Sequence, residues 1–298
     1  MELENTPFAV LATGEKGYLD LEVQVLTPGG HSSIPPEHTS IGTISKIIAR
    51  YEDSPFEPIL ANVNPTLNTL QCIANHADID KSVKKDILKA HLDKESNKRV
   101  IKLLLDNKET KFNVLTSRAA DIIYGGDKVN ALPQNVTALI NHRIAHGNDF
   151  DTVISKITKI STGVAREHGL GLIVDGKVLI EPGAAGSISL KAKYKLEVAP
   201  ITPIDDDVWV SLSGHYRTFY EDLVYPEKFQ NNTLIVSPGI MSGNTDTRHY
   251  WKLSDHIFRA QPGFTGLGSG VHGLNEYIDV DSHLQVVSFY YNYLLSIS

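Results

Sequence analysis

The stretch YLDLEVQVLTPGGHSSIPPEHTS, residues 18–40, holds a strand pattern and a shaped loop side by side. In its first half, apolar Leu19, Leu21 and Val23 alternate with acidic or amide residues. This period of two predicts a β-strand with one wet face. The glycines and prolines that follow forbid a regular strand or helix. The sequence therefore predicts a strand that leads into a loop carrying His31.

His31 has two interpretations on these residues alone. A loop histidine is a candidate for chemistry, because imidazole changes its charge near neutral pH. It can equally be a turn residue whose ring bonds to nearby backbone. The loop itself does not decide between these interpretations, so the rest of the sequence has to.

Residues 17–203 have the pattern of a compact α+β domain. After the loop, the isoleucines of TSIGTISKIIARYE fall on one helical stripe that Thr39 or Ser40 can cap. A second amphipathic helix, DTVISKITKISTGVAREHG, ends at Gly169 as expected of a glycine just past a helix. Strand-like pieces flank GGDKVNALP and recur in LGLIVDG and SISLKAKYKLEVAPI. We expect one sheet with helices on one face, and a mainly helical insertion at about 54–111 that covers another surface.

Residues 204–298 differ in character from the residues before them. The segments VWVSLSGHY, NNTLIVSPGIM and HIFRAQPGFT are interpreted as short buried strands between Gly- and Pro-rich loops. The segment VDSHLQVVSFYYNYLLS is expected to be a final amphipathic helix. The whole chain is therefore predicted to be α/β with an inserted α+β domain.

Composition excludes some classes of partner. The net charge is −7, the pI is near 5.9, and no long run of Lys and Arg occurs, which argues against nucleic acid or anionic membrane as a partner. No apolar stretch approaches the roughly 18 residues that span a bilayer. Cys72 is the only cysteine, so an intrachain disulfide is impossible. A small molecule or peptide is the expected ligand.

Two later loops contain residues suited to chemistry. PGIMSGNTDTRHYW, residues 238–251, offers Thr245 and Asp246 as hydrogen-bonding groups and Arg248, whose guanidinium can grip a carboxylate bidentately. The alternative is that Asp246 and Arg248 form a pair that only stabilises the loop. In GLGSGVHGLNEYIDVD, His272 could ligate zinc, although one histidine cannot make a metal site.

Four ordered motifs carry a family resemblance. They are EKGYLDLEVQVLTPGGHSSIPPEHTSIG, VNALPQNVTALINHRI, SPGIMSGNTDTRHYW and GVHGLNEYIDVDSHLQVVSFYYNYL. From about residue 7 to the end, the chain resembles the carboxypeptidase S branch of the di-zinc aminoacylase/carboxypeptidase family. The resemblance implies a zinc-peptidase catalytic domain with an inserted lid through which such proteins dimerise. It assigns 1–16 and 204–298 to the catalytic domain and 17–203 to the lid.

The same resemblance implies roles for four residues. The loop histidine, here His31, reaches a partner's active site and stabilises the oxyanion formed when zinc-activated water attacks an amide. Asn130 matches a lid asparagine near the substrate, and Arg248 lies in the matching substrate-side loop. His272 matches the last ligand of the two zinc ions.

The family's earlier metal-binding motifs have no counterpart in the printed sequence. No Glu-Glu dipeptide occurs, and the His-x-Asp matches at His76 and His91 lie out of order inside the helical insertion, so we interpret them as chance. A catalytic zinc needs about three protein ligands and a carboxylate base for the water. We therefore expect a truncated zinc carboxypeptidase, acting on short peptides or N-acyl amino acids, that is inactive alone.

Two other interpretations stay open. The chain could be a non-catalytic or regulatory subunit that pairs through its lid with a full-length relative, as a homodimer or heterodimer. It could also be a gene fragment with no independent role. The resemblance points to vacuolar or secretory spaces, but no targeting segment is recognised here to decide the compartment, and the substrate preference is open.

Overall fold

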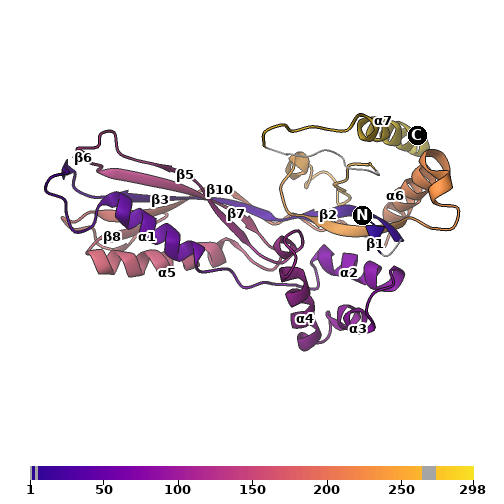
Figure 1. Ribbon diagram of the computed structural model, residues 1–298, viewed down its shortest axis with the longest axis horizontal. Helices are drawn as coiled ribbons and strands as arrows, with labels where there is room; N and C mark the ends of the chain where they lie inside the picture. The colour runs from indigo at the N-terminus through magenta and orange to yellow at the C-terminus, as the bar shows by residue number, and fades with distance from the viewer. Residues whose placement is uncertain (1, 4–5, 264–272) are drawn as a thin grey trace.

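Two β-sheets organise the molecule, joined where one strand runs almost directly into the next (Figure 1). The structure, a computed structural model, describes residues 2–3, 6–263 and 273–298. β2 (Thr6–Glu15) belongs to a three-stranded sheet and β3 (Gly17–Leu26) to a six-stranded one. Lys16 alone separates these two strands, so the residues around it form the joint between the two halves.

The large sheet has the strand order β5-β7-β3-β10-β8-β9. Its other strands are β5 (Ser117–Tyr124), β7 (Asn135–Ile144), β8 (Gly171–Val174), β9 (Lys177–Ile180) and β10 (Ser187–Leu196). Neighbours are antiparallel except β8 and β10, which are parallel. The helices α1 (Ser40–Glu52) and α5 (Phe150–His168) cover one face (Figure 1). The predicted sheet with helices on one face is confirmed.

Local sequence explains this half of the molecule. The alternating apolar residues of β3 pack in one core with α1 and α5; they are Leu19, Leu21, Val23 and Val25. Thr39 caps α1 by accepting the N–H of Gly42. α5 ends at Gly169, whose φ of 63° is a left-handed conformation that glycine adopts at little cost.

The small sheet has the order β1-β2-β11, where β1 spans Glu2–Leu3 and β11 spans Ile235–Met241. β11 runs parallel to β2 and lies in NNTLIVSPGIM, as expected. The helices α6 (Asp207–Arg217) and α7 (Val280–Ile297) lie on one side of it (Figure 1). A π-helical turn, Thr218–Val224, follows α6 directly. Among the described residues, no helix is long and apolar enough to cross a membrane.

The predicted strand at 208–216 is wrong, because these residues form most of α6. Asp206 accepts the N–H of Trp209 and caps the first turn. Leu212 and Tyr216, four residues apart, are buried on the same face of the helix. The valines of this segment favour a strand locally, and the helix cap and the core outweigh that preference.

The predicted strand in HIFRAQPGFT is also not formed over its described residues, 256–263. Strand pairing there is limited to one bridge between Arg259 and Ala12. The proline and glycine at the end of this segment leave it as an irregular chain across β2.

The segment at about 54–111, predicted to be mainly helical, contains α2 (Pro65–His76), α3 (Lys81–Lys89) and α4 (Lys94–Leu105). These helices share a core of their own. α2 lies against the small sheet, where the Thr69 hydroxyl donates to the carbonyl of Pro238 at 2.6 Å. The small sheet is therefore held between α2 on one side and α6 with α7 on the other (Figure 1).

Candidate functional site

A two-stranded ribbon brings together two of the predicted site residues. β4 (Gly30–His31) pairs antiparallel with β6 (Ala131–Leu132), which sets His31 opposite Ala131. The backbone N–H of Ser32 donates to the carbonyl of Asn130 at 3.2 Å. His31 and Asn130 are both exposed, and the ribbon brings their backbones close together.

Hydrogen bonds fix the tautomer of the neutral His31 ring. The backbone N–H of Ser33 donates to His31 Nδ1 at 3.1 Å, and the Ser33 hydroxyl lies 2.7 Å from the same nitrogen. A neutral imidazole that accepts at Nδ1 carries its proton on Nε2. Nε2 has no hydrogen-bond partner within the described residues, so this N–H is free to donate outward.

The ribbon lies at one end of the molecule, and the small sheet lies at the other (Figure 1). β3 separates them, and its ten residues span about 30 Å. Arg248 is near the joint end of this strand, because its guanidinium donates at 3.0 Å to the hydroxyl of Tyr194, which pairs with Asp20. The structure therefore does not bring His31 and Arg248 of one chain together.

Arg248 lies in a short 3₁₀ turn, Asp246–His249, and is exposed. Its partners are the Tyr194 hydroxyl and the ring of His249, at 3.0 and 3.3 Å. The alternative of an Asp246–Arg248 pair is not what the described residues form. The guanidinium thus stays accessible at the boundary between the two halves of the molecule.

A buried carboxylate, which the sequence analysis missed, holds this loop. The Glu15 side chain is fully buried, and its Oε1 accepts from Arg259 Nε at 3.0 Å and from Thr247 Oγ1 at 3.2 Å. The Thr245 hydroxyl donates to the same oxygen. These bonds fix both threonines that precede Arg248, so the loop is anchored to the end of β2. The residues are far apart in sequence, and no local pattern signals the contact.

Lys16 is buried beside Glu15 and ties the joint to the helical insertion. Its ammonium donates to the carbonyls of Phe112 and Leu115, at 3.0 and 2.5 Å. Burial, and secondarily the charge of Arg143, lowers the pKa of Lys16 to about 7. The Asn244 amide donates to the Lys16 carbonyl at 2.6 Å and adds another link to the Arg248 loop.

Three buried polar atoms at the joint have no hydrogen-bond partner among the described residues. They are Glu15 Oε2, Arg259 Nη2 and His146 Nε2. Burial lowers the pKa of His146 to about 4, so its ring is neutral at physiological pH. Buried polar atoms of this kind are usually bridged by ordered water. The joint is therefore a buried polar region, and substitutions in it are expected to destabilise the protein.

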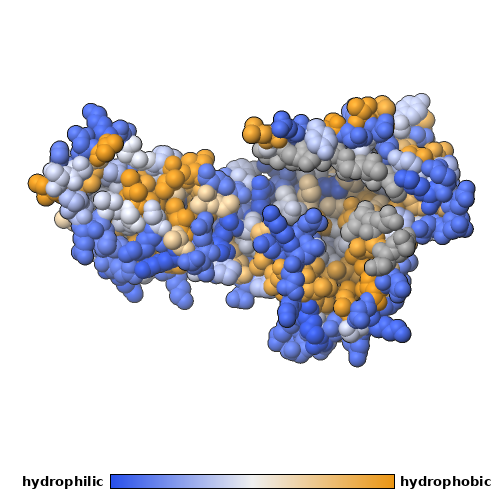
Figure 2. All heavy atoms as spheres, viewed as in Figure 1, coloured by the Kyte–Doolittle hydropathy of each residue, from blue (hydrophilic) through white to orange (hydrophobic). Residues whose placement is uncertain are grey.

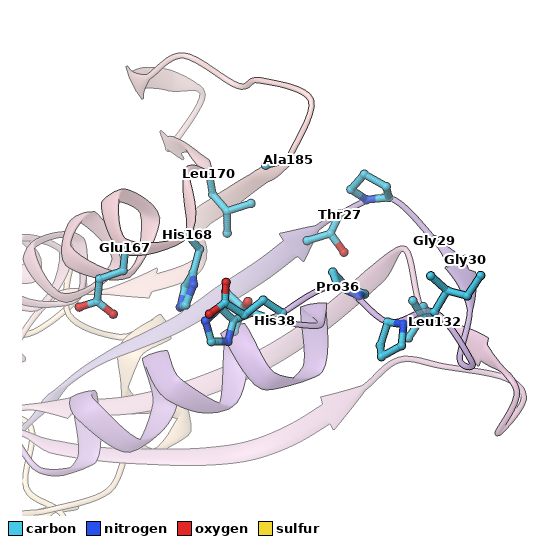
Figure 3. A pocket seen from close by; sticks show the side chains of 15 residues that line it. Thr27, Gly29, Gly30, Pro36, His38, Leu132, Glu167, His168, Leu170 and Ala185 are labelled. Atoms are coloured by element: carbon cyan, nitrogen blue, oxygen red, sulfur yellow. The ribbon is translucent and has the colours of Figure 1, made fainter.

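An open cavity of about 610 Å³ lies behind the His31 loop. Figure 3 shows its walls, which come from the loop 27–38 and the end of α5. On its wall, the rings of His38 and His168 lie 4.1 Å apart, and His168 Nε2 is 3.1 Å from Nζ of Lys46, which is not a lining residue. The wall behind the loop thus combines apolar side chains with the imidazoles of His38 and His168.

The described residues do not form a metal site. No three His, Cys, Asp or Glu side chains in this part of the chain come together in a way that could hold an ion. His272, the predicted zinc ligand, lies outside the described residues. The residues in hand therefore do not fit the pair of zinc ions that the resemblance implies.

A family model defines the class of protein to which the chain belongs. The model of the peptidase dimerisation domain matches residues 13–169, more than half of the chain. The chain therefore belongs to the M20 peptidase family, and carboxypeptidase S is among the relatives that it matches.

Carboxypeptidase S of Saccharomyces cerevisiae is 36% identical over 100% of this chain and 52% of its own length. A carboxypeptidase of Schizosaccharomyces pombe, C24C9.08, is 34% identical over 99% of this chain and 48% of its own length. The N-fatty-acyl-amino acid synthase/hydrolase PM20D1 of Mus musculus is 30% identical over 97% of this chain and 50% of its own length. The chain thus spans about half the length of the curated relatives it matches.

Two solved structures share the fold. The di-peptidase Dug1p of Saccharomyces cerevisiae has a TM-score of 0.55 at 13% identity and covers 98% of this chain and 57% of its own. The M20 metallo-carboxypeptidase Sso-CP2 of Sulfolobus solfataricus has a TM-score of 0.50 at 16% identity. This match covers 97% of our chain and 61% of the Sso-CP2 chain. At these identities the likeness concerns the fold alone.

Proposed function

We propose that this chain supplies the lid and the C-terminal part of the catalytic domain of a zinc carboxypeptidase. Its reaction is hydrolysis of the C-terminal amide bond of short peptides or N-acyl amino acids. The observation that carries the proposal is the free Nε2–H of His31, exposed beside Asn130 at the outer end of the large sheet. The names of the yeast and mouse relatives support this substrate class.

The chemistry follows from the charges that amide hydrolysis creates. Negative charge develops on the carbonyl oxygen, and a positioned N–H donor such as His31 Nε2–H stabilises it. The free carboxylate of the substrate fits the exposed fork of Arg248, which binds carboxylates bidentately. The described residues complete no zinc site, so the metal ligands and the general base are expected from outside them.

The two groups act across subunits. His31 and Arg248 are separated by about the 30 Å length of β3 in one chain, so one substrate cannot touch both. Symmetric pairing through the lid would place each His31 at the other subunit's site. The edge strand β5 exposes three apolar residues, Ile122, Ile123 and Tyr124, and is suited to such pairing.

The 298-residue polypeptide alone is expected to be inactive, because its sequence contains no Glu-Glu pair to supply the base and a ligand. The assay adds zinc and a blocked dipeptide whose C-terminal residue can be released. Turnover that disappears with chelator and survives removal of contaminating peptidases would contradict this expectation.

The proposal is tested by complementation in trans. An intact relative whose equivalent loop histidine is changed to alanine is mixed with this chain or with its His31→Ala variant. The wild-type chain should restore roughly 10²- to 10³-fold in rate, the usual worth of an oxyanion donor. His91→Ala, an exposed histidine of the helical insertion, should rescue like wild type. A mixed dimer that forms without any gain in activity would overturn the trans role.

A second function is favoured by the match to the dimerisation domain. A non-catalytic subunit needs only the lid and its exposed His31, and the matched residues 13–169 include His31 and most of the lid. The two functions are distinguished by adding the metal-binding half of a relative to this chain. A catalytic chain should then gain its own active site, measured as turnover that depends on Arg248, whereas a regulatory chain should not.

A further inference from the structure

The loop 27–38, which carries the proposed oxyanion donor, is fixed at both of its ends. The backbone N–H of Thr27 donates to the carbonyl of Gln134 at 2.9 Å. Just after the loop, the Ser40 hydroxyl donates to the carbonyl of Pro133 at 2.7 Å. A change in the position of the loop therefore has to come from the residues between these two bonds.

The second half of the loop has few bonds of its own. Residues 35–38 make no hydrogen bond within the part of the chain that the structure describes, and two of them are prolines, which have no N–H. Ile34 is 84% exposed and contributes little apolar burial. The surface at this end of the molecule mixes hydrophobic and hydrophilic residues (Figure 2). The specific contact between this segment and α5 is the one between the rings of His38 and His168.

Two imidazole rings and an ammonium meet at this contact. The rings of His38 and His168 lie 4.1 Å apart, at 64° to each other (Figure 3). Nζ of Lys46 is 3.1 Å from Nε2 of His168. Because an ammonium can only donate, this Nε2 is the unprotonated nitrogen of a neutral ring. The contact between the loop and α5 therefore requires a neutral His168.

The charged side chains around the contact balance only while both rings are neutral. On α5, Glu167 accepts from Arg50 at 2.7 and 3.0 Å and lies 3.7 Å from Nζ of Lys46. On the loop, Glu37 lines the same cavity. These are two cations and two carboxylates. Protonation of both rings adds two positive charges, and the residues that line the cavity include no further carboxylate to balance them.

Protonation of His168 is coupled to the position of the loop. Burial, followed by the charges of Lys46 and His38, lowers the pKa of His168 below its ordinary value. Glu167 and the C-terminal end of α5 favour the charged ring, but they belong to α5 and act in the same way after the loop has moved. His38 belongs to the loop. Movement of His38 away from α5 therefore makes His168 easier to protonate.

We propose that the contact between His38 and His168 is a pH-sensitive closure, which holds the second half of the loop against α5 at neutral pH and releases it when both rings are protonated. The released segment begins at a turn in which the N–H of Ile34 donates to the carbonyl of His31 at 3.1 Å. Release therefore loosens the position of the His31 ring. The consequence for turnover rests on the proposed function, whereas the movement of the loop does not.

The test is hydrogen–deuterium exchange of the full chain at pH 7.5 and 5.0, with each rate divided by the intrinsic rate at that pH. At pH 5.0, well below the ordinary histidine pKa of about 6.5, exclusion of one proton by the closed loop shifts the equilibrium roughly 30-fold toward release. Protection of peptides from the loop 27–38 should fall by roughly tenfold or more. Peptides from β3 should keep their protection.

Two uncharged variants remove the response in different ways. His168→Gln keeps an acceptor for Lys46 but cannot be protonated, and His38→Phe keeps a ring against α5 without a charge. In both, the ratio of loop protection at the two pH values should be close to one. His91→Gln, at an exposed histidine of the helical insertion, should respond like wild type.

Each outcome decides the matter. A loss of loop protection in acid that His91→Gln retains and both uncharged variants abolish supports the inference. Equal loop protection of wild type at both pH values, or the same loss in the uncharged variants, would overturn it. A loss that extends to β3 means that the lid unfolds, and it also contradicts release of the loop alone. Exchange is read without turnover, so a loop that responds to pH in a chain that restores no activity in trans refutes the proposed function and leaves this inference standing.

Discussion

The two halves of this molecule differ in how completely they bury their own apolar residues. In the lid region, defined as the large sheet with α1 and α5, strand and helix residues close one continuous core. In the C-terminal region, the small sheet with α6 and α7, the core is smaller and one helix keeps an exposed apolar seam. The large sheet with α1 and α5 thus closes a continuous core among its own elements, whereas α7 in the C-terminal region leaves a row of apolar side chains exposed.

The difference also places the functional groups. The closed lid region can hold His31 on a rigid ribbon far from its own joint. The open region holds Arg248 on a loop whose position depends on one buried ion pair at the joint. Under the proposed action across subunits, turnover would depend on a stable lid in one chain and an intact joint in the other.

Breaking the joint should have the largest effect. Glu15→Gln leaves the buried guanidinium of Arg259 without its counter-charge, which typically costs about 3–5 kcal/mol. Trp209 and Trp251 are the only tryptophans, and both lie in the C-terminal region, so their fluorescence follows that region alone. The tryptophan transition in denaturant should move to much lower concentration, while the far-UV signal of the lid persists.

Glu22→Gln is the matched control for the joint. Glu22 pairs with Lys193 at 3.3 Å on the open face of the large sheet, where a partly exposed pair contributes at most about 1 kcal/mol. Its tryptophan transition should stay at the wild-type position. If the two variants behave alike, the joint is not what holds the C-terminal region.

Local sequence patterns predicted the lid region better than the C-terminal region. The alternation in β3 and the glycine after α5 are short-range signals, and both gave the observed elements. The strand prediction for 208–216 was wrong because the valines of this segment favour a strand. The observed helix depends on a cap at Asp206 and on a core formed with residues distant in sequence. Patterns of a few residues cannot report such a core.

The candidate site shows the same limit. His31 and Asn130 were predicted separately, and the structure pairs their backbones in one ribbon. Glu15 was not predicted as a site residue, because a single glutamate at the end of a strand has the sequence pattern of a surface residue. Its importance comes from Thr247 and Arg259, which only the folded chain brings to it.

Acid should weaken the lid region through His142. This histidine is fully buried; its Nε2 accepts from the Tyr51 hydroxyl at 2.6 Å and its Nδ1 donates to the Leu19 carbonyl at 3.2 Å. Burial lowers the pKa of His142 from 6.5 to about 4. Between these values the unfolded chain takes up a proton that the native chain excludes, so stability falls as the pH falls. The loss should reach about 3 kcal/mol near pH 4.

The measurement compares lid unfolding at pH 6.5 and 4.5 by far-UV circular dichroism. Tyr51→Phe/His142→Leu removes both partners of the buried bond and should reduce this pH dependence by the contribution of His142, while His146, whose pKa burial also lowers to about 4, keeps its own. His38→Gln, outside the core on the cavity wall, should keep the wild-type slope. An unchanged slope in the double variant would show that other groups cause the acid sensitivity.

The smallest effects come from two glycines of the same helix. Gly169 has φ of 63° and no atom within 4 Å of an added Cβ, so Gly169→Ala meets only backbone strain and should destabilise the lid by about 1 kcal/mol. Gly163, inside α5, has equal space but ordinary helical φ, so Gly163→Ala should stabilise it by about 0.5–1 kcal/mol. Because neither side chain touches the joint, the tryptophan transition should not move in either variant. A shift of that transition in step with the far-UV signal would mean that both regions unfold as one unit, and the contrast between a closed lid and an open C-terminal region would then not extend to their stability.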